Sequence, residues 1–183
     1  MNRPMKVAHP VASLTDGSIE LREWAYDDVG CVEAASADPR IPAGTTVPAH
    51  FTPQAGRAFI ERQWSRADAG EGISLAIHAV RLGKAVGLVS MMLRPQPGVI
   101  GLGYWIVPVA RGQGYATRAA LLASGWAIGD GGFARIEAWV EPNNVASQAV
   151  LSAAGFEREG LLRSFLVVDG ERSDAFVYAR VVA

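Results

Sequence analysis

The apolar positions along the chain follow two periods, one typical of strands and one typical of helices. Seven segments alternate or form short apolar runs, which predicts strands. They are residues 18–24, 73–80, 84–93, 99–107, 133–140, 156–168 and 171–182. Four segments carry their apolar residues on one helical face, and they are residues 25–37, 52–69, 114–128 and 144–154. Prolines and a glycine interrupt residues 40–50, so we expect a loop there.

Turn and cap residues support these boundaries. Thr52 can cap a helix and Pro53 is tolerated at its first position, while Gly129 ends the helix at 114–128. Asp169-Gly170 is a hairpin turn between the last two strands. Residues 1–17, rich in proline and small residues, are expected to form a loose leader. Without an internal repeat or a second-domain linker, residues 18–183 are predicted to form a single mixed α+β domain.

Composition narrows the class of protein. The chain has 183 residues, half of them hydrophobic, and a net charge of −1 from 17 basic and 18 acidic residues. A general nucleic-acid binder needs an excess of positive charge, so nucleic acid is not an expected partner. Cys31 is the only cysteine, which excludes an internal disulfide and a cysteine-based metal cluster. We expect no metal site, no membrane segment or signal peptide, and a cytoplasmic location.

The segment 108–116 joins an apolar strand to an apolar helix and has the composition of an anion-binding loop. The first amides of a helix lack intrahelical partners, and glycines at 112 and 114 allow a phosphate to approach them. Arg111 would add a charge-assisted donor. An ordinary glycine-rich turn with a solvated arginine is the alternative. The dinucleotide fingerprint is excluded because Thr117 stands where it needs glycine or alanine, and there is no P-loop motif.

Arg111-x-x-Gly114-x-Ala116 matches the [Q/R]-x-x-G-x-[G/A] signature of the GCN5-related N-acetyltransferase (GNAT) superfamily. Further segments follow in the family's order, and they are Gly103-Tyr104-Trp105, Arg135-Ile136-Glu137-Ala138, Pro142-x-Asn144-x-x-Ser147, Gly155-Phe156-x-x-Glu159-Gly160, and Asp169-Gly170 with Asp174 and Tyr178. Over about residues 18–181 the chain resembles the RimJ/RimL-type branch, which includes acetyltransferases of ribosomal-protein N-termini.

The resemblance implies a single GNAT-type α+β domain. Its central sheet would be mixed, mostly antiparallel and of about seven strands, flanked by about four helices and with its middle strands splayed. The implied cofactor is acetyl-CoA. The implied reaction is acetyl transfer to a primary amine by direct attack in a ternary complex, the amine belonging to a protein N-terminus or a small molecule. A larger acyl group is left open, and relatives suggest a homodimer.

The resemblance also assigns cofactor-binding residues by motif position. They are Trp105, Ile106, Val107, Arg111, Gly112, Gln113, Gly114, Tyr115, Ala116, Asn144 and Ser147. A main-chain amide around 105–107 would donate to the thioester carbonyl, while the side chains of Tyr104 and Trp105 are read as core residues. Asn144 would contact the pantetheine arm, and the Ser147 hydroxyl would stand near the thioester sulfur. The alternative is simple capping, in which Asn143 or Asn144 closes the helix and Ser147 hydrogen-bonds locally.

The general base is the least defined part of the prediction. The RimJ/RimL-type pattern often places a glutamate two residues before Gly-Tyr-Trp, but this chain has Gly101 there. Glu137, His78 and Glu141 are the remaining candidates, alongside deprotonation through water. Because the expected acid is missing, an acyl-CoA-binding sensor without turnover is the alternative function. The acceptor site is expected among the first two helices, the loop 40–50 and the Asp169-Gly170 hairpin.

Overall fold

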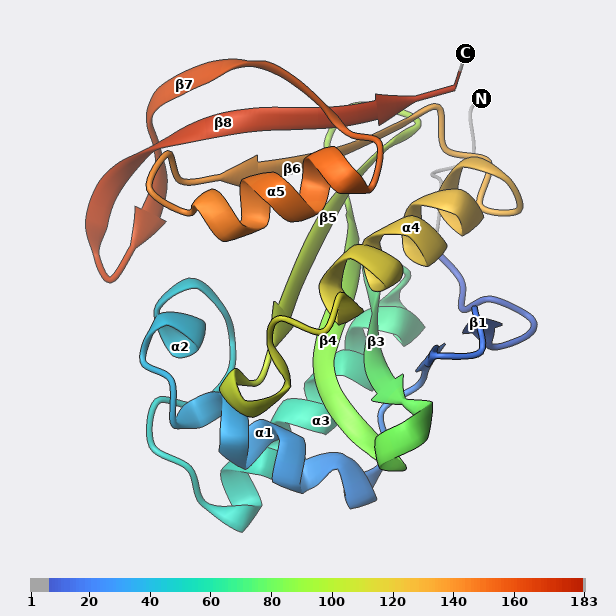
Figure 1. Ribbon diagram of the computed structural model, residues 1–183, viewed down its shortest axis with the longest axis vertical. Coiled ribbons are helices and arrows are strands. Elements are labelled where there is room, and N and C mark those ends of the chain that lie inside the picture. Colours follow the sequence, from blue (N-terminus) through green and yellow to red (C-terminus); the bar gives the residue numbers. More distant parts are fainter. Residues whose placement is uncertain (1–6, 183) are drawn as a thin grey trace.

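A computed structural model describes residues 7–182, which form a single eight-stranded sheet in the order β1-β2-β3-β4-β5-β6-β8-β7 (Figure 1). In chain order the strands are β1 (Leu14–Thr15), β2 (Ile19–Arg22), β3 (Gly72–Ala79), β4 (Lys84–Leu93), β5 (Val99–Ile106), β6 (Arg135–Val140), β7 (Glu157–Val168) and β8 (Glu171–Val181). Every neighbouring pair is antiparallel except β5 and β6, which are parallel. The predicted α+β class and mostly antiparallel sheet are confirmed.

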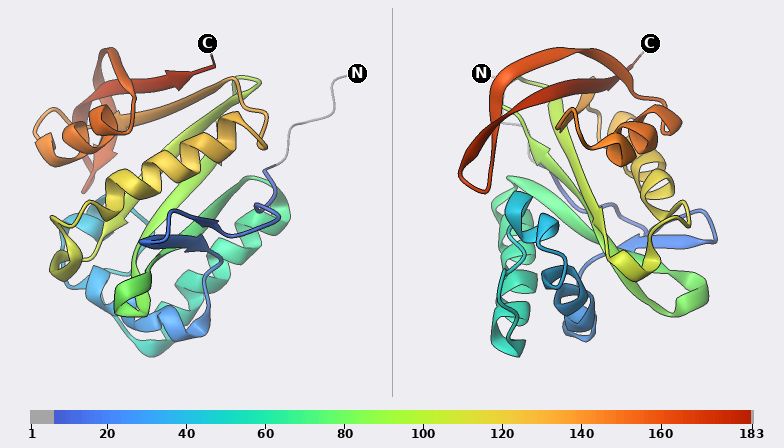
Figure 2. Two further views of the ribbon diagram at one scale, coloured as in Figure 1. Left: turned by 45° about the vertical axis from the view of Figure 1, so that its right-hand side comes forward. Right: turned by 60° about the vertical axis from the view of Figure 1, so that its left-hand side comes forward.

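Helices cover both faces of this sheet. They are α1 (Val29–Ser36), α2 (Arg40–Gly44), α3 (Pro53–Ala69), α4 (Tyr115–Ile128) and α5 (Val145–Ala153). Figure 2 shows α1 and α3 on one side of the sheet and α4 and α5 on the other. The buried face of α4 consists mostly of alanines, which let the helix lie close to the strands. None of the helices within residues 7–182 has the length and apolarity needed to cross a membrane.

The parallel pair β5 and β6 opens into a V, as predicted. Only three residues of each strand are paired, the last pair being Gly101 with Glu137. Beyond it β5 stays bonded to β4 as far as Ile106, while β6 continues along β8. Figure 1 shows the two strands diverging from this point. The sheet therefore has an internal opening whose β5 side lacks a neighbouring strand.

Two segments differ from the sequence-based expectation. Leu14–Thr15, in the predicted leader, pair with β2, and Val7 is buried, so the described part of the leader is attached to the domain. Residues 1–6 of that leader lie outside the described residues. Arg40–Gly44 form the short helix α2 instead of a loop, which gives five helices in all among the described residues. Pro39 and Pro42 fit this helix because the first turn needs no intrahelical N–H donors.

The hairpin of β7 and β8 has the predicted turn. Asp169 and Gly170 both have positive φ, 53° and 79°, as a two-residue hairpin of matching twist requires. A second irregularity interrupts the pairing between Leu162 and Leu166. There Ser164 has a φ of 51°, and its N–H donates to Asp174 Oδ1 over 2.8 Å. This bulge directs Phe165 against Trp139 of β6, with 4.6 Å between the ring centroids.

Candidate active site

The loop between β5 and α4 presents a row of free main-chain donors. Gly112 and Gly114 have φ of 74° and 76°, a region that L side chains rarely adopt, and a Cβ on either would meet only open space. Within residues 7–182, the N–H groups of residues 112–117 have no hydrogen-bond acceptor. These donors stand at the positive end of the α4 dipole. The arrangement suits an anion with several oxygens, such as a pyrophosphate.

Arg111 holds this loop in place through its side chain. Its Nε donates to the Ile106 carbonyl over 3.0 Å, and its Nη2 lies 2.7 Å from Asp38 Oδ2. Asp38 follows α1 and is buried. Burial alone would raise the pKa of this carboxyl, but hydrogen bonds from Arg40 and Arg111 outweigh it and lower the pKa to about 2. In this arrangement the amides of the loop remain free to bind an anion, while the Arg111 guanidinium is paired with Asp38.

The unpaired edge of β5 offers amides to the interior of the V. Val107 N donates to Val86 O over 2.9 Å, and the Trp105 carbonyl lies against Gly87, so these two residues face β4. Because bonding direction alternates along a strand, the N–H groups of Tyr104 and Ile106 face the open side. Of the predicted residues 105–107, Ile106 therefore has the free amide. The Trp105 side chain packs with Trp24 and Phe59 under α3, as predicted for a core residue.

Asn144 and Ser147 lie on the other side of the V, at the start of α5. Asn144 Oδ1 accepts from Ser147 N over 3.1 Å, so Asn144 caps the helix as its residue type predicts. Tyr104 OH donates to the Ser147 carbonyl over 3.1 Å and ties β5 to α5. Burial raises the pKa of Tyr104 to about 12, so its phenol stays protonated at neutral pH. The structure thus brings Ser147 across the opening from β5.

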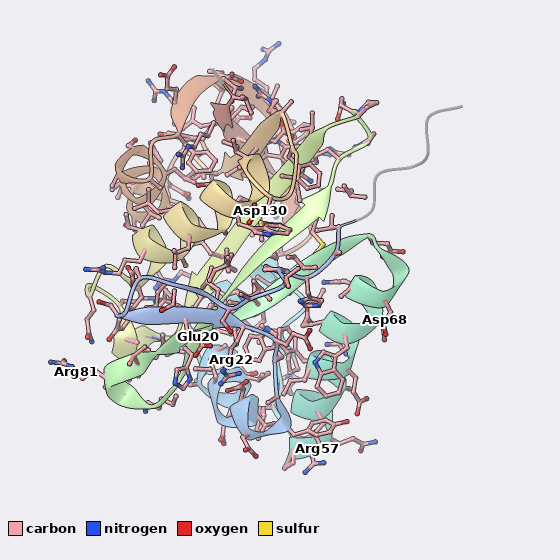
Figure 3. All side chains as sticks on the ribbon, turned by 90° about the vertical axis from the view of Figure 1, so that its right-hand side faces the viewer. Glu20, Arg22, Arg57, Asp68, Arg81 and Asp130 are labelled. Carbon is pink, nitrogen blue, oxygen red and sulfur yellow. The ribbon has the colours of Figure 1, made fainter. Side chains whose placement is uncertain are left out.

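The two weak base candidates have different surroundings. Glu137 is at the apex of the V, where its carboxylate oxygens lie 3.3 Å from Arg94 Nε and 3.4 Å from Arg135 Nε. His78 is on β3, two strands away from β5, and its Nδ1 lies 3.3 Å from Arg22 Nη2. Arg22, at the end of β2 (Figure 3), in turn pairs with Asp28, which lies next to α1. The structure therefore brings Glu137 to the site and leaves His78 in a separate cluster with Arg22 and Asp28.

Sequence reasoning missed Arg94, which follows β4. A cavity of about 450 Å³ opens at the apex of the V. It is lined by Arg94, Pro95, Gln96, Val99, Arg135, Glu137, Trp139 and Phe165. No three His, Cys, Asp or Glu side chains gather into a metal-binding cluster anywhere in the described part of the chain. The only signal for this cavity in the sequence was Gly101 itself, because a missing side chain leaves space for a neighbour.

A sheet splayed beside an anion-binding loop defines an acyl-CoA-dependent transferase of the GNAT type. Residues 18–157 match the family described as the acetyltransferase (GNAT) domain, and the chain belongs to that family. A probable N-acetyltransferase of Bacillus subtilis, YjcK, is 29% identical over 132 residues, which are 71% of this chain and 73% of YjcK.

Solved structures of other proteins share this fold. RimJ of Mycobacterium smegmatis, in complex with CoA-disulfide, has a TM-score of 0.79 at 24% identity, covering 90% of this chain and 82% of RimJ. RimL, the ribosomal L7/L12 α-N-protein acetyltransferase, in complex with coenzyme A, has a TM-score of 0.80 at 19% identity. That match covers 93% of this chain and 98% of RimL.

Proposed function

We propose that this acetyltransferase transfers the acetyl group of acetyl-CoA to a primary amine by direct attack in a ternary complex. The observation that carries the proposal is the row of free amides at 112–117, placed beside the opening between β5 and β6. The loop fits a pyrophosphate, and the opening leads from the loop to the free amides of β5. We assign cofactor binding along this path to the residues that match the family's motifs, Asn144 and Ser147 included.

The chemistry follows from the groups along the opening. Acetyl-CoA supplies an activated carbonyl carbon. The amine uses its lone pair to form the new C–N bond, while the C–S bond breaks and its electron pair leaves with the sulfur. The proton that the amine loses ends on that sulfur, so the products are the amide and the coenzyme A thiol. The Ile106 N–H is the donor we assign to the oxyanion, and the Ser147 hydroxyl is the group we assign to the sulfur. Each would stabilise charge that develops only during transfer.

A covalent acyl-cysteine route has no support in the structure. Cys31 is in α1 and only 7% exposed. Burial, followed by the nearby Asp28 charge, raises the pKa of its thiol to about 12, so the thiolate needed for attack is scarce at neutral pH. Direct attack by the amine is therefore the route that the chain's own residues support. We further propose a homodimer in the cytoplasm as the working state, as the resemblance to relatives suggests.

Thiol release from acetyl-CoA tests the proposal across a panel of N-terminal peptides, amino acids and small amines. We expect amine-dependent release by the wild type and loss of release in Gly114→Asp, which places a negative charge at the proposed pyrophosphate site. Coenzyme A binding by calorimetry accompanies the assay. Tight binding without release on any amine would instead support a sensor, and the absence of both would exclude the cofactor assignment.

A further inference from the structure

Arg94 occupies the space that a side chain at Gly101 would take. It is the first residue after β4, and its N–H donates to the Val99 carbonyl at the start of β5. Its guanidinium folds back over β5, where a Cβ on Gly101 would overlap three of its atoms. Below it lies the ring of Trp139, with 3.6 Å between the guanidinium carbon and the ring centroid. The cation is thus held flat at the apex of the V by an aromatic surface.

The charge of Arg94 is only partly compensated. Its nearest anion is Glu137, 3.3 Å from Nε, but Nε is buried without a hydrogen bond and the Nη groups have no acceptor among residues 7–182. Glu137 is shared with Arg135, which also forms a two-bond pair with Glu159. Burial lowers the pKa of Arg94, and the attraction to Glu137 offsets only part of this effect. A planar group with free N–H donors in a cavity is suited to bind a carboxylate.

The cavity opens on the face from which an amine would approach. Side chains alternate along β5, so Gly101 shares the face of Trp105, which packs toward α3. Helices α4 and α5 cover the opposite face, where the cofactor loop and Ser147 are. An acceptor therefore meets Arg94 before its amine reaches the opening.

We propose that Arg94 binds an acidic group of the acceptor, so that the enzyme prefers an N-terminal amine followed by an aspartate or glutamate at the second or third position. This inference rests on the proposed function. The Ile106 N–H, which we assign to the oxyanion, is five residues beyond Gly101, roughly 17 Å at the rise of a strand, so an acidic side chain at the third position comes nearest to Arg94. A free α-amino acid is too short to span that distance, whereas a peptide with an acidic side chain further along its chain can. The positive charge of Arg94 thus stands where the RimJ/RimL-type pattern often has the negative charge of a glutamate.

Four C-terminally amidated peptides test the preference: Ser-Glu-Ala-Ala, Ser-Ala-Glu-Ala, Ser-Gln-Ala-Ala and Ser-Lys-Ala-Ala. Thiol release gives kcat/KM for each. For the better of the two glutamate peptides we expect a value roughly ten to a hundred times that of the glutamine peptide, as one charge-assisted hydrogen-bonded pair provides. The lysine peptide should be the poorest. Equal values, or a preference for lysine, overturn the proposal.

Variants test whether Arg94 causes the preference for the glutamate peptides. Arg94→Gln should reduce the glutamate-to-glutamine ratio to about one, and Arg94→Lys should keep part of it, because the charge remains without the planar fork. Arg158→Gln removes the same charge from β7, where Arg158 stacks on Phe176 outside the cavity, and should keep the full ratio. Unchanged coenzyme A affinity in each variant shows that the domain is folded. A ratio that survives in Arg94→Gln overturns the assignment.

A binding experiment without acetyl transfer distinguishes this inference from the proposed function. Calorimetry measures the same peptides against the enzyme loaded with coenzyme A, where no transfer occurs. Tighter binding of a glutamate peptide that is lost in Arg94→Gln supports the acidic-group site even if thiol release is absent, in which case only the proposed transfer fails. Equal binding of the glutamate and glutamine peptides overturns the inference even if transfer is fast.

Discussion

Gly114 allows the charge of the cofactor loop to be tested separately from its shape. It is the N-terminal cap of α4 with a φ of 76°, and a Cβ there meets nothing within 4 Å. Asparagine and aspartate have nearly the same size, and both tolerate positive φ better than other residues. Gly114→Asn and Gly114→Asp therefore share a backbone cost of roughly 1 kcal/mol and differ mainly in charge.

The expected difference follows from Coulomb's law. A unit charge about 4 Å from a phosphate oxygen costs about 1 kcal/mol in water and about 4 kcal/mol at the dielectric typical of a protein surface. A repulsion of about 2 kcal/mol lies between these limits. At that value Gly114→Asp should bind coenzyme A about thirtyfold more weakly than Gly114→Asn. The difference in coenzyme A affinity between the two variants should become smaller at 1 M salt, where the screening length is only about 3 Å.

Isothermal calorimetry with coenzyme A at about 0.1 M and 1 M salt measures both variants, with thermal melts as the check on folding. If Gly114→Asp and Gly114→Asn bind coenzyme A equally at low salt, the phosphate does not contact this loop and the reasoning fails.

Three further outcomes test the rest of the site. Ser147→Ala should lower kcat by tenfold or more with little change in coenzyme A affinity, and wild-type kcat on a saturating acceptor would contradict its assigned role. Asp38→Asn should cost about 2 kcal/mol of unfolding free energy at pH 7, measured with urea, because the folded pKa of Asp38 is about 2 against an ordinary 3.8. This stabilisation is present above pH 4 and lost as the pH falls toward 2, so the gap between the two proteins should close over that range; a constant gap would contradict it. Tyr104→Phe should lower the unfolding free energy by about 1 kcal/mol, since the Ser147 carbonyl loses its donor, and an unchanged urea midpoint would show that water replaces that donor.

Most of the fold was predictable because its information is local. Each strand and long helix has its own period and its own cap or turn, such as Thr52 for α3 and Asp169-Gly170 for the last hairpin. The helix α2 was missed because its prolines were read as breakers. Its start depends on Asp38, whose Oδ1 accepts from Arg40 N over 3.1 Å, and on the burial of Ile41. Asp-Pro ahead of a buried isoleucine was the signal available.

The candidate site was only half predictable, for a physical reason. The cofactor loop is continuous in sequence, so its glycines could be recognised directly. The cavity under Arg94 depends instead on the pairing of Gly101 with Glu137, which are far apart in the chain, and on a bulge that brings Phe165 to Trp139. No local sequence pattern predicts contacts between residues so far apart in the chain. Gly101 therefore indicated a missing acid but not the arginine that takes its place.

The missing acid leads to a prediction about the proton. Glu137 lies between two guanidinium groups, His78 lies beside Arg22 on the far side of β4, and Glu141 accepts a hydrogen bond from Ser173, so none of the three is placed as a free base beside the opening. The reactive form is then the neutral amine that the acceptor itself supplies, and the pH dependence of kcat/KM should follow the acceptor. It should level off near pH 8 for a peptide N-terminus, whose α-amine pKa is about 7.7–8.0, and keep rising toward pH 10 for a lysine ε-amine.

Thiol release across pH 6 to 10 with both acceptors measures this, and Glu137→Gln should leave the inflection where it is. If both acceptors share one inflection and Glu137→Gln moves it, the carboxylate is the base, and the two arginines beside it set the pH at which the enzyme works.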